Sequence, residues 1–404
     1  MNRAPWVEAA PIAAWAWLDL VRRAQAAALA RLSPAPTAHP RVELAFGRGW
    51  RLLGAREPAE RGGPAVLLVP APIKCAAIFD LVPGASLFAR LVALGLCPFL
   101  LEWPEPAAGD DELGLEHHAL AVARAAEILA QARAGPIWLL GHSLGGTLSV
   151  LAALLRPEPL RGLVLLHAPL SFAPGSSPFR DALVASAPVL TSLRGRVPGS
   201  LLGFVSASAA PGTFLFGRTA DLLACAGDPG ALALHLAVER WTLEERALPA
   251  ALVREVLERL WREDALCRGR LELAGRRLRP EAFARPLLAV ASPADAIAPP
   301  AAVAPFLSAV ARAPARLLRW PFERGTVFAH LSAVLGRRAH ARLWPAIADW
   351  MRGRASAGGS PIGPTVEGSE EPLGRTPQHP HEQEPQDRPA HPEEGQEKRR
   401  DAHE

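Results

Sequence analysis

Residues 136–146 read Pro-Ile-Trp-Leu-Leu-Gly-His-Ser-Leu-Gly-Gly and contain a G-x-S-x-G motif centred on Ser143. An apolar run with strand character precedes the motif, and an Ala- and Leu-rich stretch typical of a helix follows it. A sharp turn between strand and helix exposes such a serine as a nucleophile at the end of a sheet. The motif therefore predicts acyl transfer through Ser143, with Gly141, His142 and Gly145 forming the rest of a tight elbow. The alternative is an ordinary strand-to-helix turn that happens to contain these residues.

A serine hydroxyl needs a general base, and the base is oriented by a carboxylate. In the hydrolase arrangement the chain order is serine, acid, histidine. Asp295 follows an apolar run at 286–292 that predicts a strand, and a carboxylate at that edge could accept a hydrogen bond from an imidazole. His330 and His340 follow the last predicted strand, but His340 falls inside the predicted closing helix. Asp295 and His330 are therefore the predicted acid and base; alternatively, both are plain loop residues.

The tetrahedral oxyanion of acyl transfer needs backbone donors. The N–H of Leu144 is the expected first donor. The second is expected in the loop after the apolar run at 64–69, which predicts a strand. Pro70 and Pro72 have no N–H, which leaves Ala71 or Ile73, and Ile73 is favoured. One such donor is typically worth about 3 kcal/mol of barrier. The glycines fit neither phosphate-binding nor dinucleotide-binding patterns, and we expect no cofactor and no metal.

Composition limits the other functions. The 404-residue chain is 50% hydrophobic with a net charge of +4, so most of it is expected to be globular. Scattered arginines argue against nucleic-acid binding. The four cysteines lack a C-x-x-C spacing and predict reduced thiols in a cytoplasmic protein. His167, at the end of a predicted strand, is expected to line the pocket.

The N-terminal segment 6–32 is apolar but is interrupted by charged residues, so neither a signal peptide nor a transmembrane segment is expected. Its apolar residues lie near helical spacing and predict an amphipathic helix. Such a helix would pack on the body of the protein or on a partner helix. Alternatively, it would lie on an apolar surface such as a membrane interface or a lipid inclusion.

Alternating apolar strands and helices predict an α/β fold with a doubly wound, mostly parallel sheet. The alternation of strands and helices stops at 169–284, where the sequence is helix-prone and interrupted by prolines. This stretch predicts an inserted helical cap. The expected organisation is an N-terminal amphipathic segment (1–40), a first core part (41–168), the cap (169–284), a second core part (285–353) and a disordered tail (354–404).

Several segments resemble polyhydroxyalkanoate synthases, particularly the short two-subunit type. They are the segments at 69–81, at 101–106 (Leu-Glu-Trp-Pro-Glu-Pro), at 260–278 and at 295–300 (Asp-Ala-Ile-Ala-Pro-Pro), within a resemblance covering roughly 40–352. The resemblance implies an α/β-hydrolase fold with a mobile cap that acts on 3-hydroxyacyl-CoA thioesters and a growing polyester. By the same resemblance, Ser143, Asp295 and His330 occupy the nucleophile, acid and base positions.

The sequence departs from that family at two places. The synthases use cysteine in the elbow where this chain has Ser143, and they usually carry glycine before the histidine, where this chain has Ala329. We therefore expect a serine acyl-transfer enzyme that acts on acyl-CoA or ester substrates. The alternatives are an ester hydrolase, polyester depolymerase or thioesterase, and a non-catalytic partner of a synthase. A polyester granule surface or a second subunit is a possible binding partner.

Overall fold

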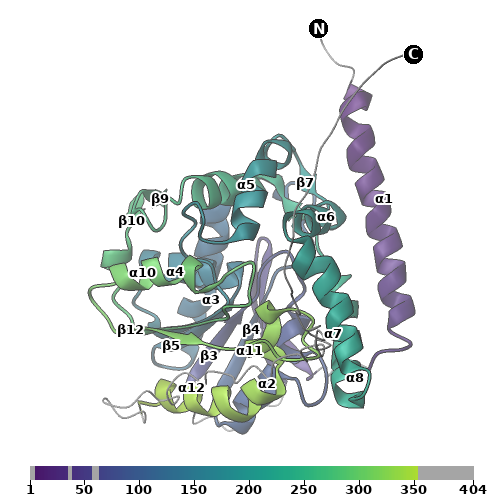
Figure 1. Cartoon of the computed structure of the whole chain (residues 1–404). Helices are drawn as coiled ribbons and strands as arrows, with labels where there is room; N and C mark the ends of the chain where they lie inside the picture. Colours follow the sequence, from purple (N-terminus) through teal and green to yellow (C-terminus); the bar gives the residue numbers. More distant parts are fainter. Residues whose placement is uncertain (1–4, 35–38, 57–62, 354–404) are drawn as a thin grey trace, which may run out of the picture. The chain divides into compact units, whose positions relative to one another are not determined.

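The computed structural model describes residues 5–34, 39–56 and 63–353, so the expected disordered tail lies outside the described residues. Within the described residues, eight strands form one sheet, in the order β1-β2-β4-β3-β5-β6-β11-β12 (Figure 1). The strands are β1 (Arg41–Gly47), β2 (Trp50–Ala55), β3 (Ala65–Val69), β4 (Cys97–Glu102), β5 (Ile137–His142), β6 (Leu160–Leu166), β11 (Leu287–Ala291) and β12 (Ala315–Arg319).

The sheet is antiparallel at one edge and parallel elsewhere. Strand β2 pairs antiparallel with β1 and β4, and every pair from β4 to β12 is parallel. In parallel strands the carboxyl ends meet at one edge of the sheet, where ligands bind in open α/β folds. This arrangement confirms the doubly wound, mostly parallel sheet expected from the sequence.

Helices cover both faces of the sheet. Successive residues of β3 face opposite sides: Leu67 and Val69 join one apolar core, and Val66 and Leu68 join the other. Helices α3 and α4 lie on one side of the sheet and α2 and α12 on the other (Figure 1). The helices of the core are α2 (Leu87–Ala93), α3 (Leu115–Ala132), α4 (Leu144–Leu155), α10 (Ala304–Ala309), α11 (Ser332–Leu335) and α12 (Trp344–Met351).

The acidic residues at 110–112 would suit the first turn of a helix, but they form a separate 3-10 turn, and α3 begins at Leu115. The first N–H of α3, on Leu115, donates to the carboxylate of Glu255 at 2.9 Å. A Cβ on Gly114 would lie 2.9 Å from the same carboxyl carbon, so a larger residue at 114 would displace this carboxylate. A residue 140 positions away thus determines where the helix starts, which explains the difference.

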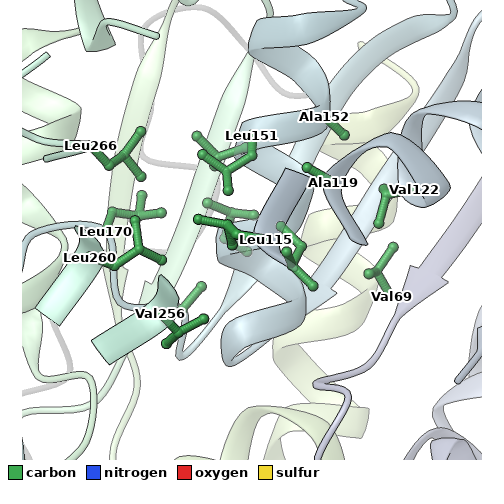
Figure 2. Packing of buried hydrophobic residues seen from close by; sticks show 14 of the residues in the cluster. Val69, Leu115, Ala119, Val122, Leu151, Ala152, Leu170, Val256, Leu260 and Leu266 are labelled. Atoms are coloured by element: carbon green, nitrogen blue, oxygen red, sulfur yellow. The ribbon is translucent and has the colours of Figure 1, made fainter. Parts of the chain in front are cut away.

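Between β6 and β11 the chain forms a helical insert, and none of its described strands joins the main sheet. Its elements are α5 (Pro178–Thr191), β7 (Arg196–Val197), α6 (Gly199–Ala209), α7 (Arg218–Cys225), α8 (Pro229–Thr242), β8 (Leu248–Pro249), α9 (Ala250–Glu255), β9 (Leu271–Leu273) and β10 (Arg276–Leu278). Figure 2 shows Val256, Leu260 and Leu266 of the insert in the same apolar cluster as Leu115 and Leu151 of α3 and α4. The insert is therefore packed on the core through a continuous apolar cluster.

Helix α1 (Pro5–Leu29) lies beside α6 and α8 of the insert (Figure 1). Arg22, which is buried, donates from Nη2 to the carbonyl oxygen of Glu245 at 2.8 Å and from Nε to Ser200 Oγ at 3.1 Å. The ring of Trp15 packs on Phe204 with centroids 5.4 Å apart. The predicted N-terminal helix therefore packs on the body of the protein.

No single helix in the described ranges has the length and apolar character needed to cross a membrane. One bent pair of helical segments, Gly199–Ala209 and Gly212–Cys225, passes that test by length and composition.

Candidate active site

Ser143 lies in a strained turn at the carboxyl end of β5. Its backbone adopts φ 54° and ψ −133°, and its N–H donates to the carbonyl oxygen of Leu166 at 2.9 Å. Backbone outliers of this kind cost of order 1–3 kcal/mol and gather at functional sites. A Cβ on Gly145 would lie 2.6 Å from the carbonyl carbon of Pro70, and one on Gly141 would lie 2.8 Å from the nitrogen of Gly146. Both motif glycines are therefore required by close backbone contacts.

Asp295 and His330 are brought together although 35 residues separate them. Asp295 follows β11, His330 lies in a 3-10 turn, and His330 Nδ1 donates to Asp295 Oδ2 at 2.7 Å. Asp295 Oδ1 accepts the N–H of Ile297 at 2.9 Å. With its proton on Nδ1, the imidazole of His330 leaves Nε2 unprotonated, and Nε2 can then accept a proton as a base.

Asp295 is fully buried, and its environment favours the ionised form. Burial raises the pKa of Asp295, but the Coulombic interaction with the protonated form of His330 and the hydrogen bonds from His167 and His330 outweigh burial and hold the pKa below its usual range. The carboxylate therefore remains charged at neutral pH, as orientation of an imidazole requires.

His167 contacts Asp295 and is absent from the cavity lining, so the expectation that it lines the pocket is wrong. Its Nδ1 donates to Asp295 Oδ2 at 3.0 Å, and its Nε2 is buried without a hydrogen-bond partner among the described residues. Burial lowers the pKa of His167, so it serves as a neutral donor. A sequence signal existed: His167 and Asp295 follow β6 and β11, but only the structure shows that these strands are neighbours.

His142 links the elbow to the histidine loop, the segment 320–331 that follows β12 and contains His330. It is buried, and its Nε2 donates to the carbonyl oxygen of His330 at 3.0 Å. Burial, together with the nearby charge of His330, lowers the pKa of His142 to about 3. His142 is therefore neutral at pH 7. Because it directly precedes Ser143, its hydrogen bond holds the backbone of His330 close to the elbow.

The two predicted oxyanion donors lie near the elbow. Leu144 is the first residue of α4, where helical N–H groups lack intrahelical partners. Ile73 lies in the loop after β3, and its carbonyl oxygen accepts the N–H of Arg246 at 2.9 Å. Lys74, the next residue, donates to Glu245 Oε1 at 2.7 Å. The insert therefore fixes the loop that carries Ile73.

A cavity of about 590 Å³ joins these residues. Its lining includes Ser143, Leu144, Ile73 and His330 from the core; Phe179, Phe214 and Trp261 from the insert; and Trp15, Leu18 and Val21 from α1. Apolar side chains dominate this set, as expected for a pocket that accepts an acyl chain. Ser143, His330, Leu144 and Ile73 thus line one apolar cavity.

A match to a family model agrees with this architecture. Residues 104–198 match the family model described as alpha/beta hydrolase fold. The chain is 27% identical over 298 residues to the poly(3-hydroxyalkanoate) polymerase subunit PhaC of Haloferax mediterranei, a match covering 72% of this chain and 59% of that protein. It is 26% identical over 245 residues to the subunit of the same name from Synechocystis sp., covering 58% of this chain and 65% of that protein. A solved thermophilic esterase from Thermogutta terrifontis has a TM-score of 0.46 at 16% identity, covering 78% of this chain and 100% of that one.

The sheet order and the match over residues 104–198 give the chain an α/β-hydrolase fold. Within that class it is similar to the polymerase subunits of polyhydroxyalkanoate synthesis, as the sequence resemblance implies. The matches span 59% and 65% of the length of those two relatives.

Proposed function

We propose that this protein is a serine-nucleophile acyl-transfer enzyme that acts on hydroxyacyl thioesters or esters through an acyl-Ser143 intermediate. One observation carries the proposal: the strained elbow serine and a histidine paired with a buried carboxylate line the same apolar cavity. The similarity to polymerase subunits supports hydroxyacyl substrates.

The reaction follows from these groups. His330 Nε2 takes the hydroxyl proton as Ser143 Oγ attacks the carbonyl carbon, and Asp295 stabilises the resulting imidazolium. The N–H groups of Leu144 and Ile73 donate to the oxyanion. The intermediate then expels the thiolate or alkoxide of the leaving group, which receives the proton from His330. Water or a hydroxyl group then attacks the carbonyl carbon of acyl-Ser143, with His330 again as base. The ester bond to Ser143 Oγ breaks, and His330 returns the proton to Ser143 Oγ as the acyl product leaves.

The identity of the nucleophile favours a second candidate, an ester hydrolase or thioesterase. An acyl-Ser143 ester is a weaker donor to a chain-end hydroxyl than a thioester would be, and its natural fate is hydrolysis. Both candidates share acylation and differ only in the acceptor.

Exposed apolar side chains support a granule or partner surface as the binding partner. They lie on α1 and on the insert: Trp17, Leu20, Phe204, Phe216 and Leu223 are each more than half exposed. Sedimentation with polyester particles would test this part of the proposal, and a protein that stays in the supernatant would refute it.

The decisive experiment compares wild type, Ser143→Ala and Ser186→Ala with 3-hydroxybutyryl-CoA. Ser186 is an exposed serine of α5 outside the cavity lining, so its variant is the matched control. We measure free CoA, insoluble polyester and labelling by a fluorophosphonate probe. CoA release with polymer, lost only in Ser143→Ala, supports a synthase; release with free hydroxy acid supports the hydrolase. An unlabelled, inactive wild type would leave the non-catalytic partner as the better hypothesis.

A further inference from the structure

A buried carboxylate of the insert contacts the loop that leads to His330. Asp221, on α7, accepts the N–H of Gly325 on Oδ1 at 2.9 Å and the N–H of Val327 on Oδ2 at 3.1 Å. The side chain of Asp221 is 1% exposed, so these bonds are shielded from water. Asp221 thus binds the backbone of the histidine loop three and five residues before His330.

That stretch of the loop is strained and needs an external restraint. Gly325 has φ 81°, and Val327, a β-branched residue, has φ 63°. Positive φ is an outlier for a branched residue and persists only where surrounding contacts enforce it. A Cβ on Gly325 would lie 2.8 Å from the carbonyl oxygen of Ala231 on α8, so the loop also fits tightly against the insert. One of the two bonds to Asp221 comes from the N–H of Val327, the strained residue itself.

A second helix of the insert orients Asp221. His235, on α8, is buried and donates from Nδ1 to Asp221 Oδ2 at 2.7 Å. The carboxylate therefore accepts three N–H groups, one from α8 and two from the loop. With these partners its position depends on α7 and α8 packing together.

The core holds the same loop from the other side. Glu323 accepts the N–H groups of Arg338 at 2.8 Å and Ala339 at 3.0 Å, and its Oε1 accepts Trp320 Nε1–H at 2.9 Å. Glu323, itself a residue of the loop, therefore binds it to the core, and Asp221 binds it to the insert. Phe328, the residue after Val327, lines the cavity and packs on Phe214 with ring centroids 5.2 Å apart.

We propose that Asp221 is a positioning residue that couples the helical insert to the catalytic base. In addition to the bond from His142, the bonds from the loop to Asp221 on α7 keep His330 in place beside Asp295. The proposal rests on the proposed function of Ser143 and His330, since a base that does no chemistry needs no positioning. It assigns the insert a role in assembling the catalytic centre as well as covering the cavity.

The test compares Asp221→Asn with Asp228→Asn. Asparagine offers one acceptor oxygen where the carboxylate offers two, and its NH2 would face an N–H donor. Asp228, the N-cap of the neighbouring α8, has a side chain that is 43% exposed. It also accepts two backbone N–H groups, but they belong to α8, and it pairs with Arg337 outside the stretch 321–331, so it is the matched control. We measure hydrogen–deuterium exchange of the peptide covering 321–331, thermal unfolding, kcat and KM.

Asp221→Asn should exchange that peptide faster and lower kcat about 100-fold, the usual effect of a misplaced catalytic group. KM should change by roughly threefold or less, because cavity side chains remain. Asp228→Asn should change neither exchange nor kcat by comparable amounts. Unchanged exchange and kcat in Asp221→Asn, or equal effects in both variants, would overturn the proposal.

If Asp221→Asn does not fold, His235→Leu decides, because it removes one donor to the carboxylate and leaves the loop sequence intact. Faster exchange at 321–331 with lower kcat supports the coupling, and unchanged exchange refutes it. An inactive wild type that the fluorophosphonate probe does not label would refute the proposed function instead. The exchange comparison would still report whether Asp221 holds the loop.

Discussion

Replacing Asp295 by asparagine tests the assignment of the base most directly. Asp295 Oδ1 accepts the N–H of Ile297, and Oδ2 accepts Nδ1–H from both His330 and His167. If the asparagine oxygen keeps the bond to Ile297, its NH2 takes the place of Oδ2 and faces two N–H donors. Both histidines must then accept at Nδ1, which moves the proton of His330 to Nε2. The histidine can no longer take the proton of Ser143.

The wrong tautomer in a serine triad lowers kcat by about 10⁴-fold. At 1.36 kcal/mol per factor of ten, this loss corresponds to about 5.4 kcal/mol of barrier. We expect this loss in the rate of fluorophosphonate labelling at pH 7 and in CoA release. Asp349→Asn is the control, because the Asp349 side chain is 54% exposed and lies on α12. A folded Asp295→Asn variant that keeps a rate within about tenfold of wild type would refute the assignment of His330 and Asp295.

Three further predictions follow from single contacts. In Gly145→Ala the new methyl group would lie 2.6 Å from backbone of the loop after β3, so we expect kcat to fall about 100-fold; Gly212→Ala, where a Cβ meets nothing within 4 Å, should match wild type. The folded pKa of His142 is about 3 against an ordinary value of 6.5, so the unfolded state binds more protons and stability present above pH 6.5 is lost as pH falls toward 3. Urea unfolding at several pH values gives the slope of the unfolding free energy against pH. In His142→Gln this slope should be shallower than in wild type by up to about 1.4 kcal/mol per pH unit, and an unchanged slope would contradict the assignment of a neutral His142. Arg22→Ala leaves the groups of the insert that Arg22 binds without a donor and should expose α1 to limited proteolysis. Arg23→Ala should not, because the Arg23 side chain is 55% exposed. Equal cleavage of both variants would show that Arg22 does not anchor α1.

Local signals predicted much of the fold. Buried parallel strands are short apolar runs, and the strand-turn-helix around Ser143 is coded by neighbouring residues, so both could be read along the chain. The two motif glycines follow from contacts within a few residues or with the adjacent strand end. Helix boundaries were less predictable, as at Leu115, because a distant carboxylate caps that helix.

The sequence by itself determined which residue types could perform acyl transfer and in which order they occur along the chain. Only the tertiary structure decided which side chains share a hydrogen bond. His167 joins Asp295 because β6 and β11 are adjacent, and Asp221 reaches the histidine loop because the insert packs against it. The physical reason is that strand order and helix packing depend on non-local burial, which leaves no periodic signal at the residues that meet.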